Sequence, residues 1–220
     1  MSTNSRVHFT KEMTELNEEI LRMGILVEEA IKKSIDALRD QNEILAQEVI
    51  KEDDRINELE LELFDKISIL LATEQPVATD LRQLTGAIRI VSDLERAGDY
   101  AVHIAEGALR LSEEKYITQL KQIPETAAIA RQMLKDALTA FVNNDTELAR
   151  EVASRDEILD KSHKKLLKKM LKYMNKDDDA DVDQATNLIF LARFIERLGD
   201  HITNVCEWVI YTKTGKHIEL

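Results

Sequence analysis

The chain is poor in residues that interrupt or cross-link a polypeptide. Its 220 residues include two prolines, six glycines and one cysteine, Cys206. So few turn-forming residues favour long helices, and a single cysteine excludes an internal disulfide and suits a reducing compartment. No apolar run approaches the roughly 20 residues that cross a bilayer. The segment Met1–Lys11 is polar and lacks the apolar stretch of a signal peptide. We therefore expect a cytoplasmic protein that reaches membranes only peripherally, through partners.

Basic residues are scarce relative to acidic ones. The chain has 30 lysines and arginines against 42 aspartates and glutamates, which gives a formal net charge of −12. A surface of this sign repels the phosphate backbone, so we expect no direct nucleic-acid partner. Hydrophobic residues make up 44% of the sequence, which is enough to build a core.

The motifs of common enzyme classes are also missing. We find neither a glycine-rich phosphate loop nor a G-x-S-x-G nucleophile elbow, and Cys206 has no histidine placed as its base. Di-iron oxygenases are built on paired Glu-x-x-His motifs, and the nearest approach here is Asp160-x-x-His163. The sequence therefore predicts a protein that is not an enzyme.

One short phrase occurs twice. Residues 92–106 read S-D-L-E-R-A-G-D-Y-A-V-H-I-A-E, and residues 193–207 read R-F-I-E-R-L-G-D-H-I-T-N-V-C-E. Both contain Glu-Arg-x-Gly-Asp, followed seven residues after the Asp by a Glu. One copy lies near the end of each half of the chain, which indicates a tandem repeat of one helical unit.

Apolar residues recur at three- and four-residue spacing through both halves, as in amphipathic helices. We expect six long helices at about residues 9–39, 44–71, 77–111, 124–142, 146–174 and 182–210. Pro76 should lie in the first turn of the third helix, Asp145 should cap the fifth, and residues 175–181 should form an acidic loop. The predicted fold is all-α, with two tandem, structurally similar three-helix bundles at residues 1–115 and 116–220.

The repeated phrase places carboxylates in pairs. Glu95 with Asp99, and Glu196 with Asp200, lie at i, i+4 on one helix face, where they repel each other unless a cation lies over them. Hard cations take carboxylate oxygens, and iron and manganese also occur in all-carboxylate sites. The alternative is a solvated acidic face that Arg96 or Arg197 neutralises.

The middle helices supply a second pair in each half. Residues 46–49 (A-Q-E-V) match residues 149–152 (A-R-E-V), which aligns Asp53 and Asn57 with Asp156 and Asp160. In a helical hairpin the two pairs of one half can face each other and close one site. Asn57 contributes an oxygen but no charge, so we expect the first site to bind metal more weakly than the second.

Three further features allow two interpretations each. Gly98 and Gly199, inside the repeated phrase, indicate close approach of either a neighbouring helix or a ligand, because glycine otherwise destabilises a helix by about 1 kcal/mol. His103 either extends the first site or packs against neighbours. The lysines of the fifth helix either form a solvated face or meet anionic lipid or an acidic partner; they are Lys161, Lys164, Lys165, Lys168, Lys169 and Lys172.

Several stretches carry a resemblance to a known family. Residues 75–82 read Q-P-V-A-T-D-L-R and residues 92–99 read S-D-L-E-R-A-G-D. Residues 192–201 read A-R-F-I-E-R-L-G-D-H, with V-I-Y at 209–211 and T-G at 214–215. This pattern resembles the PhoU family of phosphate-uptake regulators over essentially the whole chain, including the duplication.

The resemblance implies two similar three-helix bundles side by side in a cytoplasmic, commonly dimeric protein. It also implies a negative regulator that links the high-affinity phosphate ABC transporter, through its ATPase subunit, to the phosphate-sensing histidine kinase. Such proteins bind metal clusters through Glu/Asp-x-x-x-Asp motifs. By position, the implied ligands of divalent or trivalent ions (Fe, Zn, Mn, Mg or Ca) are Glu95, Asp99, Asp53, Asn57, Glu196, Asp200, Asp156 and Asp160.

Two other functions stay open on the sequence. One is a helical adaptor for another phosphate transporter, with or without metal. The other is an enzyme that uses a carboxylate-held metal, which would need an open coordination position and a substrate pocket.

Overall fold

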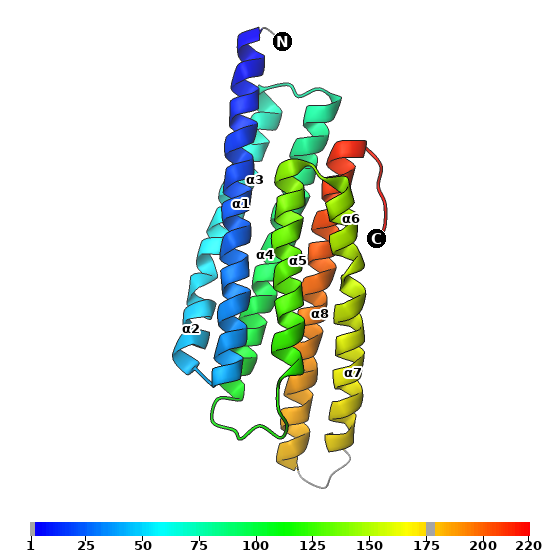
Figure 1. The fold of residues 1–220 in the computed structure, drawn as a ribbon. Helices are drawn as coiled ribbons and strands as arrows, with labels where there is room; N and C mark the ends of the chain where they lie inside the picture. Colours follow the sequence, from blue (N-terminus) through cyan, green and yellow to red (C-terminus); the bar gives the residue numbers. More distant parts are fainter. Residues whose placement is uncertain (1–2, 175–178) are drawn as a thin grey trace.

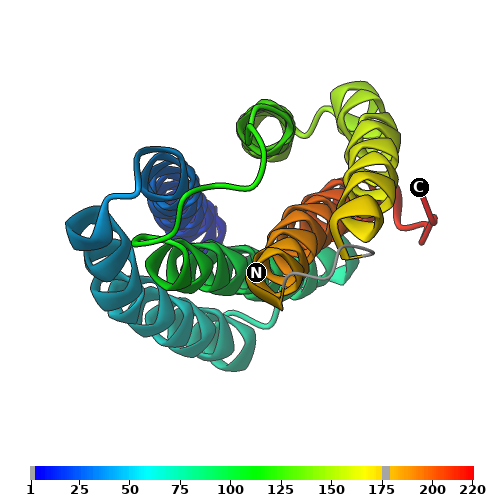
Figure 2. The same cartoon turned by 90° about the horizontal axis from the view of Figure 1, so that it is seen from below.

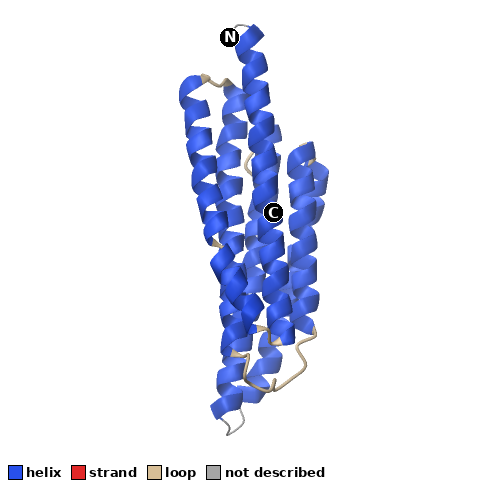
Figure 3. Ribbon diagram, turned by 90° about the vertical axis from the view of Figure 1, so that its left-hand side faces the viewer, coloured by secondary structure: helices blue, strands red, loops and turns tan. Residues whose placement is uncertain are grey.

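The structure, a computed structural model, describes residues 3–174 and 179–220 and contains eight helices within them (Figure 1). The described residues include no strand (Figure 3), so the all-α prediction is confirmed. In chain order the helices are α1 (Thr3–Asp40), α2 (Glu43–Glu52), α3 (Asp54–Thr73), α4 (Ala78–Arg110), α5 (Gln122–Asn143), α6 (Thr146–Ser154), α7 (Asp156–Met174) and α8 (Asp179–Thr214).

The six expected long helices are all present, and each of the two middle ones is divided once. Asp53 separates α2 from α3, and Arg155 separates α6 from α7. At both breaks the hydrogen bonding shifts to three-residue spacing: the amide of Ile56 donates to the carbonyl of Asp53 at 2.8 Å, and that of Ile158 to the carbonyl of Arg155 at 2.9 Å. Such a local tightening bends a helix without ending it.

Viewed along the helices, α3, α4, α8 and α7 form a curved layer, and α1 and α5 lie on one face of it (Figure 2). α4 and α8 pack along each other in the middle of this layer, and α1 also packs against α5. One cluster of buried apolar side chains therefore runs through both repeats. Burying a valine, leucine, isoleucine, phenylalanine or methionine side chain contributes about 1.5–3 kcal/mol, so contact between the repeats helps to stabilise the fold. The division into domains at residue 115 stays a prediction.

Short polar segments set the helix ends. Gln41 and Asn144 adopt positive φ angles of 52° and 50° at the turns that follow α1 and α5. The next residues cap the following helices: the side chain of Asn42 accepts a hydrogen bond from the amide of Leu45, and that of Asp145 from two amides of α6. The predicted cap at Asp145 is thus confirmed, since short polar side chains satisfy otherwise free amides there.

Four predicted boundaries need correction. α1 begins at Thr3 rather than near residue 9. Pro76 precedes the N-cap residue Val77 rather than lying inside the helix. α8 continues to Thr214, past the expected end of the sixth helix at about residue 210. Of the expected acidic loop 175–181, residues 175–178 lie outside the described part, and Asp179 already begins α8.

The segment between the repeats is held by two glutamines. The amide group of Gln41 donates to the carbonyls of Leu111 at 2.8 Å and Glu114 at 2.8 Å. From α8, the buried Gln184 accepts from the amide of Ile117 at 2.6 Å. Both repeats thus hold the connecting segment in place.

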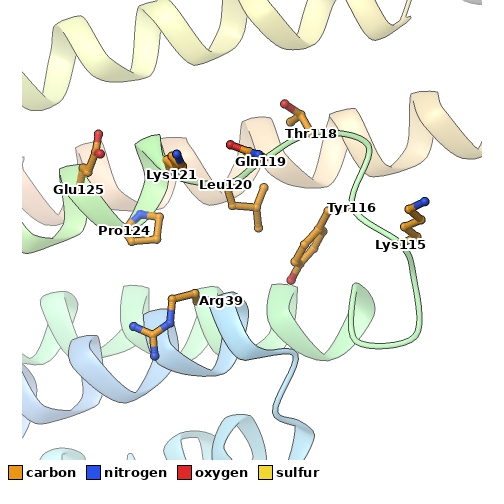
Figure 4. Close-up of a pocket in the computed structure, with 9 residues that line it drawn as sticks. All are labelled: Arg39, Lys115, Tyr116, Thr118, Gln119, Leu120, Lys121, Pro124 and Glu125. Carbon is orange, nitrogen blue, oxygen red and sulfur yellow. The ribbon is translucent and has the colours of Figure 1, made fainter.

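A cavity of about 620 Å³ lies between this connecting segment, the end of α1 and the start of α5 (Figure 4). Tyr116 and Leu120 point toward α1, and the phenol of Tyr116 donates to the carbonyl of Leu38. None of the eight predicted metal ligands lines the cavity. Within the described residues, no helix is both long and apolar enough to cross a membrane.

Candidate functional site

The first acidic site lies between α3 and α4, beside the break at Asp53. Asn57 follows Asp53 by one turn, and its amide donates to Oδ2 of Asp53 at 3.1 Å. From α4, the charge of Asp99 acts on Asp53, and the charges of Asp99 and Asp53 act on Glu95. The structure therefore brings the four residues predicted for the first half close together.

The second site has the same plan between α7 and α8. Asp156 is the first residue of α7, directly after the break, and Asp160 lies one turn further. Glu196 and Asp200 of α8 face them, because the charges of Asp200, Asp160 and Glu196 all act on Asp156. The bend in the middle helix thus places the first carboxylate of the site in each repeat.

Burial is the largest cause of raised pKa values in both sites. In the first it raises the pKa of Asp53, and together with Asp99 it raises the pKa of Glu95 to about 7. In the second it raises the pKa of Asp156 to about 6, with Asp200 as the next cause, and also raises the pKa of Glu196. Desolvation and like charge both disfavour the ionised carboxylate, so each site would gain from an added cation.

The glycines of the repeated phrase explain how the helices come so close. A Cβ on Gly199 would lie 2.3 Å from Oδ1 of Asp156 and 2.6 Å from Cδ2 of Leu159. A Cβ on Gly98 would lie 3.3 Å from Cδ1 of Ile56 and 3.6 Å from Oδ1 of Asp53. Close approach of the middle helix therefore accounts for both glycines, and the approach is closer in the second repeat. In each repeat the absence of a glycine Cβ lets the first carboxylate of the site lie over α4 or α8.

Each site also has basic neighbours. In the first, Arg96 serves two carboxylates, with Nη1 3.2 Å from Oδ2 of Asp99 and Nε 3.6 Å from Oε2 of Glu95. In the second, each basic residue serves one: Arg193 pairs with Glu196, Arg197 with Asp200 at 3.6 Å and Lys164 with Asp160 at 2.9 Å. The interpretation as a neutralised acidic face thus has a structural basis, most of all in the second repeat.

Glu60 was not predicted from the sequence, yet it borders the first site. Burial raises the pKa of this carboxyl, the charge of Asp99 acts on it, and its own charge acts on Glu95. It therefore restores to the first site the carboxylate that Asn57 lacks. The sequence contained the information needed to find it, because Glu60 lies on the same helix face as Asp53 and Asn57, one turn further along. His163 is the residue at the matching position of the second repeat.

Two histidines near the motifs have separate roles. Nδ1 of His103 lies 3.4 Å from Oε2 of Glu106, and its ring packs against Tyr100 and Phe194. The charge of His103 nevertheless acts on Asp53, so it borders the first site. His201 turns instead toward α4, with Nδ1 2.9 Å from Oδ1 of Asp93, and links the two repeats.

Three buried oxygens in these sites have no hydrogen-bond partner. They are Oδ1 of Asn57, Oδ1 of Asp156 and Oε2 of Glu196. Buried polar atoms are rarely left so, and these are of the kind that hard cations bind. As the described side chains stand, however, no group of three or more histidine, cysteine, aspartate or glutamate residues is arranged to hold a metal ion. The sites are converging pairs rather than closed cages.

Comparison with known proteins identifies the family. The PhoU domain model matches twice, at residues 20–108 and 123–209, and each match contains one copy of the repeated phrase. The chain belongs to the PhoU family. The resemblance seen in the sequence is thus confirmed, and the two matched segments agree with the tandem repeat.

Relatives named as phosphate-specific transport system accessory protein PhoU homologues cover nearly the full length. The homologue from Clostridium acetobutylicum is 39% identical, over 98% of this chain and 99% of the relative. The one from Aquifex aeolicus is 39% identical over 95% of this chain and 94% of the relative. Homologue 1 from Thermotoga maritima is 35% identical over 97% and 92%.

Solved PhoU structures share the fold. The crystal structure of PhoU from Pseudomonas aeruginosa superposes with a TM-score of 0.90 at 34% identity and covers 94% of this chain and 100% of its own. The phosphate transport system regulatory protein PhoU from Streptococcus pneumoniae gives 0.90 at 30% identity, over 96% and 100%. Tandem bundles of the PhoU type are therefore the architecture of this chain.

Proposed function

We propose that this protein is an accessory regulator of phosphate transport. It limits the activity of the high-affinity phosphate ABC transporter, and keeps the phosphate-starvation response silent when phosphate is abundant. It acts by protein–protein contact with the ATPase subunit of the transporter and with the phosphate-sensing histidine kinase, and it is not an enzyme. The observation that carries the proposal is the double PhoU match over nearly the whole chain.

The location and assembly follow from the same role. A regulator that meets an ATPase subunit and a kinase works in the cytoplasm and reaches the membrane through those partners. The family resemblance adds a homodimer. A regulator of this kind works by binding one conformation of its partner more tightly than another.

We further propose that each acidic site holds a divalent or trivalent metal ion. The chemistry of the donors supports this, because unpartnered oxygens from Asn57, Asp156 and Glu196 lie among carboxylates with raised pKa values. A bound ion would supply positive charge that neutralises the facing pairs. The chain's own side chains would fix the geometry between the middle helix and α4 or α8, so the metal's role is to set the shape of each bundle.

A reporter of the phosphate-starvation response tests the regulatory part. In cells that lack this protein and grow with abundant phosphate, we expect the reporter to switch on, and the wild-type gene to silence it. A reporter that stays off while phosphate uptake changes would favour an adaptor for another phosphate transporter. A reporter and an uptake rate that both stay unchanged would contradict the proposal.

Metal analysis after dialysis tests the acidic sites separately. We expect bound metal in the wild-type protein and none in the quadruple variant Glu95→Ala, Asp99→Ala, Glu196→Ala, Asp200→Ala. The matched control removes four exposed carboxylates elsewhere and should keep its metal: Glu18→Ala, Glu113→Ala, Glu147→Ala, Glu219→Ala. If the wild-type protein holds no metal and still silences the reporter, the metal proposal fails and the regulatory one stands.

A further inference from the structure

The two repeats differ strongly in charge although they share one fold. Residues 1–115 contain 25 acidic and 14 basic residues, whereas residues 116–220 contain 17 and 16. Almost the whole net charge of −12 therefore lies in the first repeat. The difference is not spread evenly over the surface, because it is concentrated on two helices that occupy equivalent places.

Those helices are α3 and α7, which lie at opposite edges of the helical layer (Figure 2). α3 packs only against α1, α2 and α4, and α7 only against α5, α6 and α8, among the described elements. Each therefore has one face that no described element of the same molecule covers. The alignment of Asp53 with Asp156 places the exposed residues of these two faces at matching positions.

The two faces are opposite in charge at those positions. Five exposed residues of α3, here called the acidic face, are Glu58, Leu61, Glu62, Asp65 and Ile69. The matching residues of α7, here the basic face, are Lys161, Lys164, Lys165, Lys168 and Lys172, all exposed. Every acidic residue of the first set has a lysine as its counterpart in the second.

Within the described part of the molecule, few of these charges are paired. Lys161 pairs with Glu157, and Lys164 with Asp160. The other three lysines of the basic face, and all three acids of the acidic face, have no ion pair within about 4 Å among the described residues. Arg22 and Arg55 line the same groove as Glu58 and Glu62, whereas Asp65 does not line it.

The acidic face also exposes apolar surface. The side chain of Leu61 is 63% exposed and that of Ile69 is 61% exposed. Lysine side chains cover such residues well, because their aliphatic stems pack on apolar surface while the ammonium group reaches a carboxylate. A row of lysines is therefore complementary to this face in two ways, through charge and through the stems.

We propose that the acidic face of α3 in one molecule binds the basic face of α7 in a second copy of this chain. The contact joins two different faces at opposite edges of the molecule (Figure 2), so it is heterologous, and repeating it builds a ring or an open chain of copies. The proposal names a contact between copies of this chain and leaves the surface of the homodimer proposed above open. It depends on neither the metal sites nor the regulatory role, and its test reads the mass of the assembly alone.

Charge reversal on each face gives a direct test by sedimentation of the full-length protein over a range of concentrations. The basic-face variant is Lys165→Glu, Lys168→Glu, and the acidic-face variant is Glu62→Lys, Asp65→Lys. Each variant then sets like charges against each other at the altered positions, so we expect about a tenfold or larger rise in the dissociation constant for self-association of either variant. Wild-type association should also weaken in about 0.5 M salt.

Mixing the two variants is the decisive measurement. The carboxylates introduced at positions 165 and 168 would then face the ammonium groups introduced at positions 62 and 65 of the other chain. The unaltered faces remain complementary, so the mixture should associate as the wild type does. The control Lys32→Glu, Lys51→Glu makes the same change in net charge as the basic-face variant, at exposed positions of α1 and α2, and should associate normally. Helical content by circular dichroism confirms that each variant is folded.

Three results would overturn the proposal. The first is a wild-type protein that stays monomeric at every concentration. The second is a folded variant whose association does not weaken, and the third is a mixture that fails to associate. Sedimentation with vesicles of phosphatidylglycerol and of phosphatidylcholine completes the test, because a monomeric wild type that pellets only with the anionic vesicles would assign the basic face to membrane binding instead.

Discussion

In the first acidic site a single arginine, Arg96, forms ion pairs with two carboxylates. In the second site each carboxylate that is paired has its own basic partner: Arg193, Arg197 or Lys164. Both sites hold four carboxylates once Glu60 is counted in the first. Asn57 was the reason to expect a weaker first site, but Glu60 removes that reason and the difference in basic neighbours reverses the order. We therefore predict tighter metal binding in the first repeat. The comparison teaches that cations around a site matter as much as its ligands.

The largest expected effect sharpens the comparison of packing. Gly199→Ala should lower the free energy of unfolding by about 1–3 kcal/mol, because the new Cβ meets Asp156 and the buried Leu159. Gly98→Ala should stay within about 1 kcal/mol of the wild type, since its contacts are looser and alanine favours the helix. Urea denaturation of both variants measures the difference. Equal losses would show that the two glycines do not differ as the structure indicates.

The next effect concerns pH. Burial and Asp99 raise the pKa of Glu95 to about 7 in the folded protein, against an ordinary value of 4.5, so between these values the folded state holds a proton that the unfolded state has released. Protonated Glu95 therefore stabilises the folded, metal-free protein most fully below pH 4.5. As the pH rises through about 7, the free energy of unfolding should fall by about 2 kcal/mol. Glu95→Gln should flatten this decrease in urea denaturation at a series of pH values. Glu196→Gln should flatten it less, because Arg193 offsets part of the rise there.

A third prediction tests the carboxylate that only the structure revealed. Glu60→Gln should weaken metal binding to the first site by about tenfold and leave the second unchanged. The matched variant at the equivalent position, His163→Gln, should change the first site not at all. Calorimetric titration with manganese distinguishes the two classes of site. Unchanged binding in Glu60→Gln would place this carboxylate outside the metal's environment.

The smallest effect is expected at Asn57, where the second site has Asp160 in place of an amide. Asn57→Asp adds a fifth carboxylate to a buried group, so the metal-free protein at about pH 8 should lose about 0.5–1.5 kcal/mol of stability. Saturating manganese should reverse that loss. Thermal unfolding with and without the ion measures both, and a variant that is destabilised equally in the two conditions would contradict a metal site here.

Much of the fold was accessible from the sequence because helical periodicity and the duplication are strong local signals. The helix ends at Asn42 and Asp145 follow from side-chain capping, which depends on nearby residues alone. The breaks at Asp53 and Arg155 were not predicted, since the backbone dihedral angles there remain helical and the neighbouring residues include no proline or glycine.

The candidate sites show the same limit. Spacing placed Glu95 with Asp99 and Glu196 with Asp200 on single faces, and alignment of the repeats supplied the facing pairs. Glu60 could have been found by extending that face one turn. The contact between His201 and Asp93 could not have been predicted from the sequence. It joins residues of different repeats and depends on how α4 packs along α8.

That packing of α4 along α8 bears on how the gene arose. A single repeat would leave the apolar flank of its third helix open to water, so an ancestor of half this length is expected to have folded only as a pair of identical chains. In the present chain the segment 111–121 joins the two repeats covalently, while α4 and α8 hold them together by packing. It follows that cutting this segment should not separate the halves, and that two fragments expressed together should reassemble.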